Sequence, residues 1–108
     1  MIFVETVAFE SPAAVSDEYG RTESGWTAEF TCRAHFLYLR GGETVQAARL
    51  EGRQPIVATI RSHDLARQVT PGWRMIDTQR SVTYNVRSVV PTDDRRHVEV
   101  TAESGVAV

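Results

Sequence analysis

The clearest alternation of apolar and polar residues runs through positions 26–39, WTAEFTCRAHFLYL. Apolar side chains occupy every second position from Trp26 to Tyr38, and Thr, Glu, Arg and His residues occupy most of the positions between them. A period of two is typical of a half-buried β-strand. The run exceeds the usual length of about five or six residues, so we expect a bend or an end that projects beyond the sheet.

Five more segments have the pattern of strands, and one has the pattern of a helix. The strand-like runs are 2–9, 54–61, 73–77, 81–90 and 97–102. Residues 43–50, ETVQAARL, fit about two helical turns with Val45, Ala48 and Leu50 on one face, and Gly52 stands where a C′ glycine ends a helix. A helix this short is marginal in water, so we expect it to pack on the sheet or on a neighbouring chain.

Long connections separate these elements. Residues 10–25 are rich in small, polar and acidic residues without a sustained period, which predicts a long loop. Residues 62–72 predict a second loop, whose few apolar anchors, Leu65, Ala66 and Val69, would hold it weakly. Residues 91–96 predict a turn, and residues 103–108 a mobile tail. About six strands with one short helix predict a mainly β fold, a small antiparallel β-barrel or sandwich with long loops.

Composition narrows the class of protein. The 108 residues predict a single domain, 1–108, because two smaller cores would not be stable alone. A net charge of -2 lacks the basic excess of a tight duplex binder. The 12 basic residues are all arginine, whose planar fork of donors suits ion pairs at interfaces. The first residues lack the basic region of a signal peptide, and no apolar run approaches a membrane span of about 20 residues.

No arrangement of residues predicts catalysis. A catalytic site needs a nucleophile, a base and an orienting group within reach. Cys32 and His35 are three residues apart on a predicted strand, so Cys32 should face the core and His35 the solvent. The adjacent pair His63 and Asp64 has no third partner, and His97 opens a strand at a solvated position. We therefore expect no catalytic residue.

Metal and cofactor sites are not predicted either. The three histidines are scattered, and the single cysteine forms no Cys-x-x-Cys motif and no internal disulfide. Asp93 and Asp94 have neither the spacing nor the number of ligands of a calcium loop, and no glycine-rich phosphate loop precedes a helix. Binding and assembly remain as the predicted functions.

The order of the motifs resembles that of the head-tail joining, or head completion, proteins of tailed bacteriophages, which also occur in gene transfer agents. The resemblance spans about residues 17–100, and its specificity lies in the order of individually weak motifs. The matching positions are Trp26, Arg33-Ala34, Gly42-Glu43, Ala47 or Ala48, Leu50, Gly52, Ile60-Arg61, Thr70-Pro71-Gly72, Val86, Val89 and Asp93 to Arg95. Two departures leave local geometry open: Ser62-His63 replaces an aromatic residue, and DTQRS lacks the usual hairpin glycine.

The resemblance implies a small β-barrel that assembles into a cyclic homo-oligomer beneath the portal. Such a ring extends the DNA channel, helps to retain packaged DNA and offers a platform for the tail. Its neighbours would be the portal or an adaptor ring on one side and a tail terminator or tail tube on the other. Double-stranded DNA would pass through without tight binding, and the location would be the neck of a particle assembled in the host cytoplasm, with no membrane and no cofactor.

Two groups of residues are the candidate contact sites. We expect the helix and its flank to contact the next subunit through Glu43, Arg49, Glu51, Arg53 and Arg61. We expect the loop 62–72 to reach toward the channel or the neighbouring ring through Ser62, His63, Asp64, Arg67 and Gln68. The alternatives are a helix that only caps the barrel and a surface hairpin without a role. We also expect the isolated protein to be wholly or partly monomeric, with rings forming on the portal complex.

The alternative class is a nucleic-acid-binding barrel of OB type. Such a barrel needs aromatic side chains interleaved with basic ones on one face. Here the aromatic residues of 26–38 share the apolar face and Arg33 lies on the other, which favours a core over a binding platform. An enzyme is a third alternative, which the lack of a catalytic constellation disfavours.

Overall fold

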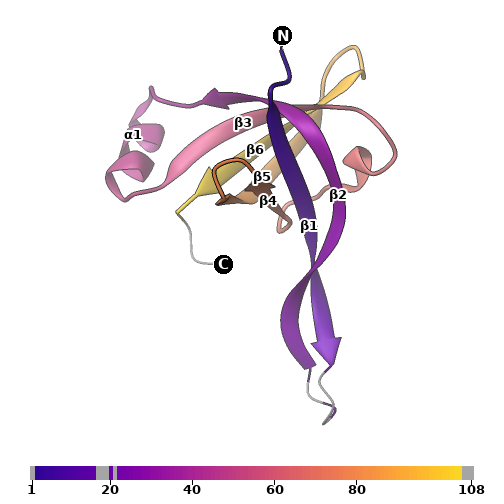
Figure 1. Cartoon of the computed structure of the whole chain (residues 1–108). Helices are drawn as coiled ribbons and strands as arrows, with labels where there is room; N and C mark the ends of the chain where they lie inside the picture. The colour runs from indigo at the N-terminus through magenta and orange to yellow at the C-terminus, as the bar shows by residue number, and fades with distance from the viewer. Residues whose placement is uncertain (1, 17–19, 21, 106–108) are drawn as a thin grey trace.

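Six antiparallel strands close into a barrel in the computed structural model, which describes residues 2–16, 20 and 22–105 (Figure 1). Around the barrel the strands follow the order β1-β2-β3-β6-β5-β4, and β4 pairs back onto β1. The bounds are β1 Glu5–Ser16, β2 Thr22–Tyr38, β3 Gln54–Arg61, β4 Arg74–Asp77, β5 Val82–Pro91 and β6 His97–Ser104. The mainly β fold is confirmed, and of the two predicted architectures it is the barrel.

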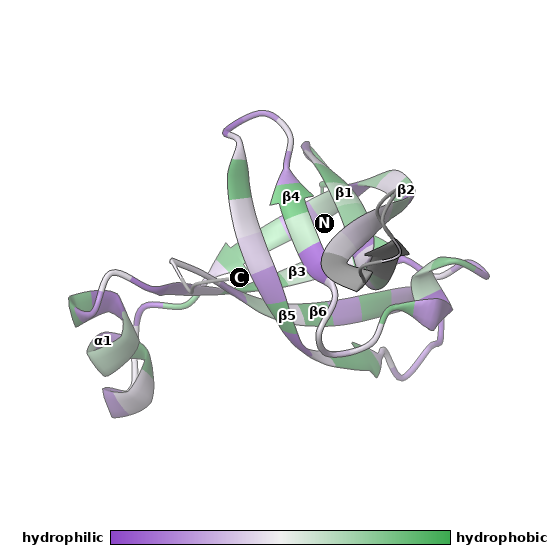
Figure 2. Cartoon of the chain, turned by 90° about the horizontal axis from the view of Figure 1, so that it is seen from below, coloured by the Kyte–Doolittle hydropathy of each residue, from purple (hydrophilic) through white to green (hydrophobic). Residues whose placement is uncertain are grey.

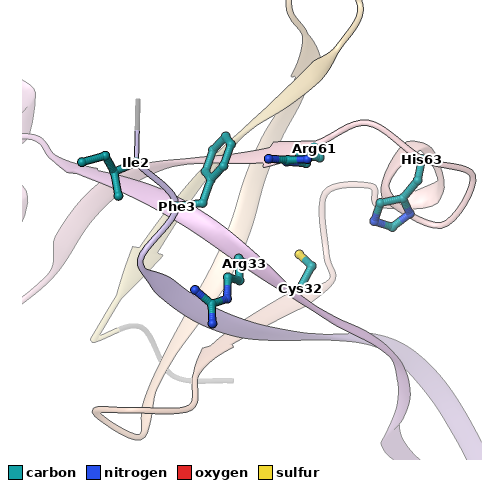
Figure 3. Close-up of a pocket in the computed structure, with 6 residues that line it drawn as sticks. All are labelled: Ile2, Phe3, Cys32, Arg33, Arg61 and His63. Carbon is teal, nitrogen blue, oxygen red and sulfur yellow. The ribbon is translucent and has the colours of Figure 1, made fainter.

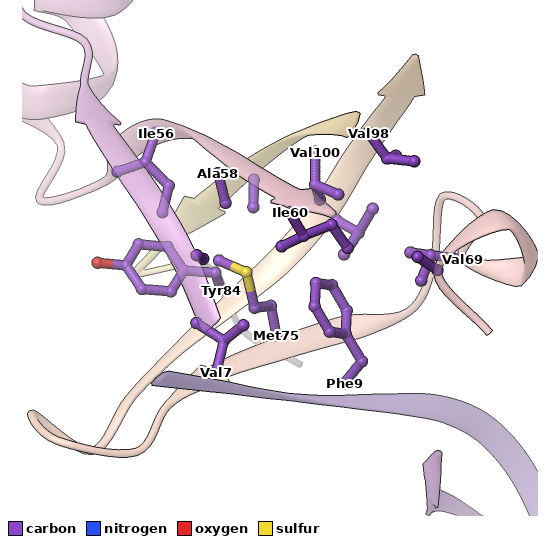
Figure 4. Close-up of a cluster of buried hydrophobic side chains, with 14 residues drawn as sticks. Val7, Phe9, Ile56, Ala58, Ile60, Val69, Met75, Tyr84, Val98 and Val100 are labelled. Atoms are coloured by element: carbon purple, nitrogen blue, oxygen red, sulfur yellow. The ribbon is translucent and has the colours of Figure 1, made fainter. Parts of the chain in front are cut away.

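Alternate residues of the strands fill the interior (Figure 4). Phe9, Ile56, Ile60 and Met75 are among the largest side chains that are fully buried, and each such side chain contributes about 1.5–3 kcal/mol through burial. The predicted alternation of β3 is confirmed on its inner face, Ile56, Ala58 and Ile60. The remaining core residues are Val7, Ala34, Ala66, Val69, Tyr84, Val86, Val98, Val100 and Ala102.

Strand β2 serves two structures in turn. Its second half lines the barrel, where Ala34 is buried and Phe30, Cys32 and Phe36 pack partly buried against the core. The β1–β2 register then shifts, because Phe9 pairs with Phe30 whereas the next residue pairs with Ala28. Such a bulge bends a strand and increases its local twist. The predicted bend and projecting end are both present.

The predicted long loop at 10–25 is wrong. Strand β1 continues to Ser16 and β2 begins at Thr22, and the two pair without interruption beyond the bulge. We call the pairs from Ser11–Thr27 to Ser16–Thr22 the β1–β2 arm, which projects from the barrel in Figure 1. The described side chains of the arm, those of residues 11–13 and 25–27, are exposed or half-buried, so no core imposes an apolar period on this part of the sequence. Residues 17–19 and 21, also assigned to that loop, lie outside the described residues.

The turn between β4 and β5 has no glycine and is stabilised by a buried carboxylate. Asp77 is fully buried and accepts hydrogen bonds from the backbone N–H groups of Gln79 and Arg80 at 3.1 and 3.3 Å. The Arg80 guanidinium lies 2.8 Å from the same carboxylate and 2.5 Å from that of Glu5. Ser81 takes the left-handed backbone conformation, with φ of 57°. These contacts explain how DTQRS forms the turn without glycine.

The C-terminal strand is longer than predicted. Glu103 and Ser104, assigned to a mobile tail, continue β6, where they pair with Pro55 and Gln54 of β3. Pairing on both sides of β6, with β3 and with β5, holds these residues in place. Residues 106–108 of the predicted tail lie outside the described residues.

Candidate functional site

The helix α1, Glu43–Leu50, stands beside the barrel on a closed stem (Figures 1 and 2). The stem forms where β2 ends and β3 begins. The backbone N–H of Leu39 donates to the Pro55 carbonyl at 3.1 Å, and Gln54 Nε2 donates to the Leu39 and Pro55 carbonyls at 3.0 and 2.7 Å. Both ends of the connection are therefore fixed, although the helix has little contact with the barrel.

The C-terminal end of α1 is capped by backbone hydrogen bonds. The N–H of Gly52 donates to the Arg49 carbonyl at 3.0 Å, and that of Arg53 donates to the Ala48 carbonyl at 2.8 Å. Gly52 has φ of 82°, which a C′ glycine adopts without strain. The predicted helix bounds and the predicted C′ glycine are both confirmed.

The same end of α1 is tied to β6. A Cβ added to Gly105 would lie 2.3 Å from the Gly52 carbonyl oxygen, so the two backbones are in close contact. Arg53 Nη1 lies 3.0 Å from Glu103 Oε1, and Arg53 Nη2 lies 2.6 Å from the carboxylate of Glu51. Oε1 of Glu103 is buried and accepts no well-aligned hydrogen bond, so its attraction to Arg53 is electrostatic. The C-terminal end of α1 is thus anchored to the barrel.

The outer face of α1 carries an uncovered apolar residue. Leu50 is 90% exposed, whereas Ala48 is 6% exposed. The prediction that Leu50 lies on the same face as Ala48 is wrong. Residues two positions apart in a helix are separated by about 200° around the helix axis. Leu50, Arg49 and Gln46 line a hollow of about 380 Å³.

The predicted interface charges divide into two sets. Glu43 and Arg49 are exposed, and neither forms an ion pair with another residue in the described part of the chain. Glu51 and Arg53 already form an ion pair with each other. Glu43 and Arg49 are therefore the helix charges best placed to pair with another molecule.

The connection from β3 to β4 is packed more firmly than predicted. Ala66 is fully buried and Val69 is 3% exposed, both within the core cluster. Ala66–Gln68 forms a 3-10 turn, η1, in which residues three apart lie on the same side. The N–H of Ala66 donates to Nδ1 of His63 at 3.1 Å, and that of Ser62 donates to the Arg96 carbonyl at 2.8 Å. The expectation that intrachain packing would hold this loop weakly is wrong.

The outer face of the same loop is polar. Asp64, Arg67 and Gln68 are exposed, and the Arg67 guanidinium donates to the carboxylate of Asp64 and to the Ser62 hydroxyl. His63 is half-buried against Phe30, with the ring centroids 5.2 Å apart. The five residues predicted for this loop therefore lie together, but His63 faces inward while the others border solvent.

Arg61 and His63 meet at a cavity of about 630 Å³, which we call the lateral pocket (Figure 3). Pairing between β2 and β3 ends at Ala34 and Ile60, and the two strands separate beyond these residues. The lateral pocket is lined by Ile2, Phe3, Cys32, Arg33, Arg61 and His63. Sequence reasoning missed Phe3 and Arg33. The register of β2 against β3 brings Arg33 to this pocket, and the N-terminal segment brings Phe3 there.

The N-terminal segment crosses the outside of the barrel at the lateral pocket. The Arg61 guanidinium lies 5.7 Å from the centroid of the Phe3 ring, and the Phe3 and His97 rings are 5.5 Å apart. His35 Nδ1 lies 3.2 Å from the carbonyl oxygen of Ile2. His35 is on the outer side of β2, as predicted, whereas His97 packs on an aromatic ring and is not simply solvated.

The thiol of Cys32 lies between the core and the lateral pocket. Burial raises the pKa of Cys32 to about 11, so the thiol is protonated at neutral pH. Within the described residues, no three His, Cys, Asp or Glu side chains gather into a possible metal site. No helix in the described ranges has the length and apolar character needed to cross a membrane.

The base of the β1–β2 arm holds a further group that sequence reasoning missed. The Arg74 guanidinium lies 4.5 Å from the centroid of the Trp26 ring and donates a hydrogen bond to the carboxylate of Glu10. The Ser11 hydroxyl donates to the carboxylate of Glu29 at 2.8 Å. These contacts fix the arm where it leaves the barrel, and they place Arg74 against the ring of Trp26.

Comparisons with known proteins agree with this geometry. A family model described as phage head completion protein matches residues 3–105. The solution structure of protein SF1141 from Shigella flexneri 2a has a TM-score of 0.71 at 13% identity, covering 98% of this chain and 96% of that chain. A chain of the virion of a native gene transfer agent particle has a TM-score of 0.65 at 19% identity, covering 99% of both chains. No curated protein sequence matches.

Proposed function

The chain belongs to the phage head completion protein family, and on this premise we propose that it forms a ring in the neck of the particle, beneath the portal. The protein is thereby a structural component of a phage or gene-transfer-agent virion. In the proposed ring, copies of the chain surround the channel through which double-stranded DNA passes. The ring helps to retain the DNA and presents a platform for the tail.

The observation that carries the proposal is the exposure of α1. A helix fixed at its C-terminal end presents Leu50, 90% exposed, together with the exposed charges of Glu43 and Arg49. An exposed leucine beside charged groups is suited to an interface, whose centre is apolar and whose rim is polar. In a ring each copy offers this surface to a different surface of the next copy. We propose that α1 is the contact between neighbouring subunits.

The outer residues of the loop 62–72 supply a second proposed contact. Asp64, Arg67 and Gln68 project from a firmly packed base, and we propose that they face the channel or the neighbouring ring. Shortening the loop from 62 to 68 would remove Ala66 from the core, so point substitutions are needed. We expect Arg67→Glu to give joined particles that lose DNA, measured as DNA per purified particle, with Arg95→Glu as the control in the β5–β6 turn.

Several features support a conduit over the OB-type alternative. Phe30, Phe36 and Tyr38 pack partly buried against the core, which leaves only part of each ring for stacking on a base. The net charge of -2 provides no general attraction for phosphates. Tight binding of phosphates by the channel wall would impede the passage of DNA. These observations favour passage of DNA over its capture.

The test of the proposed function uses Arg49→Glu in producing cells that lack the wild-type chain. We expect the isolated variant to keep its melting temperature, because Arg49 makes no ion pair in the described part of the chain. We expect electron microscopy to show heads without joined tails. Arg40→Glu, another exposed arginine, is the control. Normal particles with Arg49→Glu would mean that α1 is only a cap on the barrel.

The oligomeric state of the isolated protein gives a second test. We propose that closed rings form on the portal complex and that the free chain is wholly or partly monomeric. Native mass spectrometry at micromolar concentration should therefore detect the monomer. A spectrum that contains only stable closed rings would contradict assembly on the portal.

A further inference from the structure

We propose that the lateral pocket binds a carboxylate side chain that a protein partner presents next to an apolar residue. The inference deepens the proposed function, on which it rests for the presence of such a partner in the neck. The interaction itself is a property of this chain and is open to test in solution.

The shape of the lateral pocket follows from the separation of two strands. After the pair Ala34 and Ile60, β2 and β3 diverge. His63, whose ring centroid lies 5.2 Å from that of Phe30 on β2, lines the pocket. Ile2 and Phe3 border the pocket from the N-terminal segment (Figure 3). The cavity of about 630 Å³ is large enough for a side chain and its neighbour.

The polar side chains that line the pocket offer donors. Arg33 and Arg61 each carry a guanidinium, which binds carboxylates through paired N–H groups. Nδ1 of His63 accepts the Ala66 N–H, so the neutral imidazole carries its proton on Nε2 and has a donor to offer. Cys32 keeps its proton, because burial raises its pKa to about 11. No carboxylate is among the lining residues in the described part of the chain.

The two arginines have no anionic partner within the described residues. Neither Arg33 nor Arg61 lies within 4.0 Å of a carboxylate there, although five other arginines do. Asp64, the acid closest in sequence to Arg61, is held by Arg67. An arginine without a counter-charge gains more from an incoming anion than an arginine already in an ion pair.

The apolar wall favours a protein partner over nucleic acid. The Arg61 guanidinium lies 5.7 Å from the centroid of the Phe3 ring, and Ile2 also lines the pocket. A DNA backbone is bound by a row of cations along its phosphates, whereas this pocket has two arginines beside apolar side chains. The combination fits one carboxylate with an apolar neighbour, as an acidic peptide segment supplies.

The test is a titration of the isotope-labelled protein followed by nuclear magnetic resonance. Phenylacetate is the probe, since it joins a carboxylate to an apolar ring, and phenylacetamide is its uncharged counterpart. We expect saturable shifts of the backbone amides of Cys32, Arg33, Arg61 and His63 with phenylacetate. Binding of phenylacetamide should be weaker by about tenfold or more, the effect expected for loss of a charged hydrogen-bond partner.

Variants distinguish the pocket from the rest of the surface. Arg61→Gln and Arg33→Gln should each weaken phenylacetate binding about tenfold, whereas Arg40→Gln, at an exposed arginine that does not line the pocket, should leave it unchanged. Equal binding of phenylacetamide, or shifts that persist in both pocket variants, would overturn the proposal. A short DNA duplex that shifts the same amides at lower concentration than phenylacetate would also overturn it, in favour of a phosphate site. Because the isolated chain is measured, a failure here leaves ring assembly untouched, and failed assembly of α1 variants leaves this binding untouched.

Discussion

The two connections on either side of β3 are ordered by opposite means. The connection that contains α1 is held by its stem, its C-terminal cap and the Arg53–Glu103 pair, and it leaves Leu50 90% exposed. The connection that contains η1 is held by burial of Ala66 and Val69 at 0% and 3% exposure. One connection is therefore part of the barrel's own core, whereas the other is kept in shape without being covered.

The difference shows which connection has an exposed apolar side chain that a partner could cover. Apolar side chains that a loop buries stabilise the fold that contains them. An apolar side chain held in the solvent stabilises nothing until another molecule covers it. The η1 connection therefore contributes its buried residues to the fold and leaves only its outer residues for contact, whereas we propose α1 as the contact between subunits. The following substitutions test this division.

The largest difference in the free energy of unfolding is expected between two variants that each place a carboxylate in one of the two connections. Val69→Asp should destabilise the barrel by several kcal/mol, because an unpaired carboxylate would enter the core. Leu50→Asp should change the free energy of unfolding by less than about 0.5 kcal/mol, because the site is already in solvent. Urea denaturation measures both, and Thr70→Asp, exposed beside Val69, is the control. Equal losses at positions 50 and 69 would remove the distinction.

Removing the anchor of α1 should have an intermediate effect. Arg53→Ala takes the nearest cation from Glu103, whose side chain is 12% exposed, and should cost about 1–3 kcal/mol. Hydrogen exchange should quicken in residues 43–50 more than in η1, because the pair joins α1 to β6. Arg40→Ala, at an exposed arginine, is the control. Unchanged exchange in α1 would show that the backbone cap alone holds the helix.

The cap itself should contribute less. Gly52→Ala forces a side chain into the left-handed region, φ of 82°, at a cost of about 1 kcal/mol. Gly41→Ala is the matched control, since Gly41 lacks a positive φ and has open space around it. Thermal unfolding and the helical signal of circular dichroism report the result. If both substitutions have the same effect, the cap does not determine the order of α1.

The smallest expected effect on stability comes from ionisation of the Cys32 thiol. Cys32 lines the same pocket as His63 of the η1 connection, so its rate of alkylation is a probe of that side of the barrel. With its pKa raised from 9.0 to about 11, the folded thiol at pH 8 should be alkylated about 100-fold more slowly than the unfolded one. Because the folded thiol holds its proton to a higher pH than the unfolded one, the contribution of this proton to the free energy of unfolding is fully present below about pH 9. It is lost as the pH rises through 11. Val69→Ala should quicken alkylation and Leu50→Ala should not. Equal rates in both variants would contradict a role of the η1 connection in covering this end of the core.

Sequence patterns predicted the elements that a core or a cap defines. The inward alternation of Ile56, Ala58 and Ile60 gave β3, and Gly52 gave the end of α1. The β1–β2 arm was missed because its described side chains, at 11–13 and 25–27, are not buried in a core that would impose a period. The firm packing of the η1 loop was missed because it depends on only two buried residues, Ala66 and Val69. They are three positions apart, and a single such spacing is too short to recognise as a pattern.

The candidate sites were harder to predict, because they depend on residues far apart in sequence. Arg53 pairs with Glu103 only because β6 ends beside α1. Arg33 and Arg61 border one pocket only because β2 and β3 separate after Ala34 and Ile60. Composition and local spacing contain no information on contacts that depend on strand register. They led only to the expectation that Arg49, Arg61 and the loop make contacts, which stays a prediction.

The most direct test of the assembly account compares an exposed leucine from each connection. Leu50→Asp and Leu65→Asp, at side chains 90% and 40% exposed, are introduced separately into particles, and the fraction of heads joined to tails is counted by electron microscopy. Both isolated variants should remain folded. The account predicts that Leu50→Asp leaves most heads unjoined and that Leu65→Asp gives the wild-type fraction. The same fraction for both variants would contradict the claim that α1 is the subunit contact.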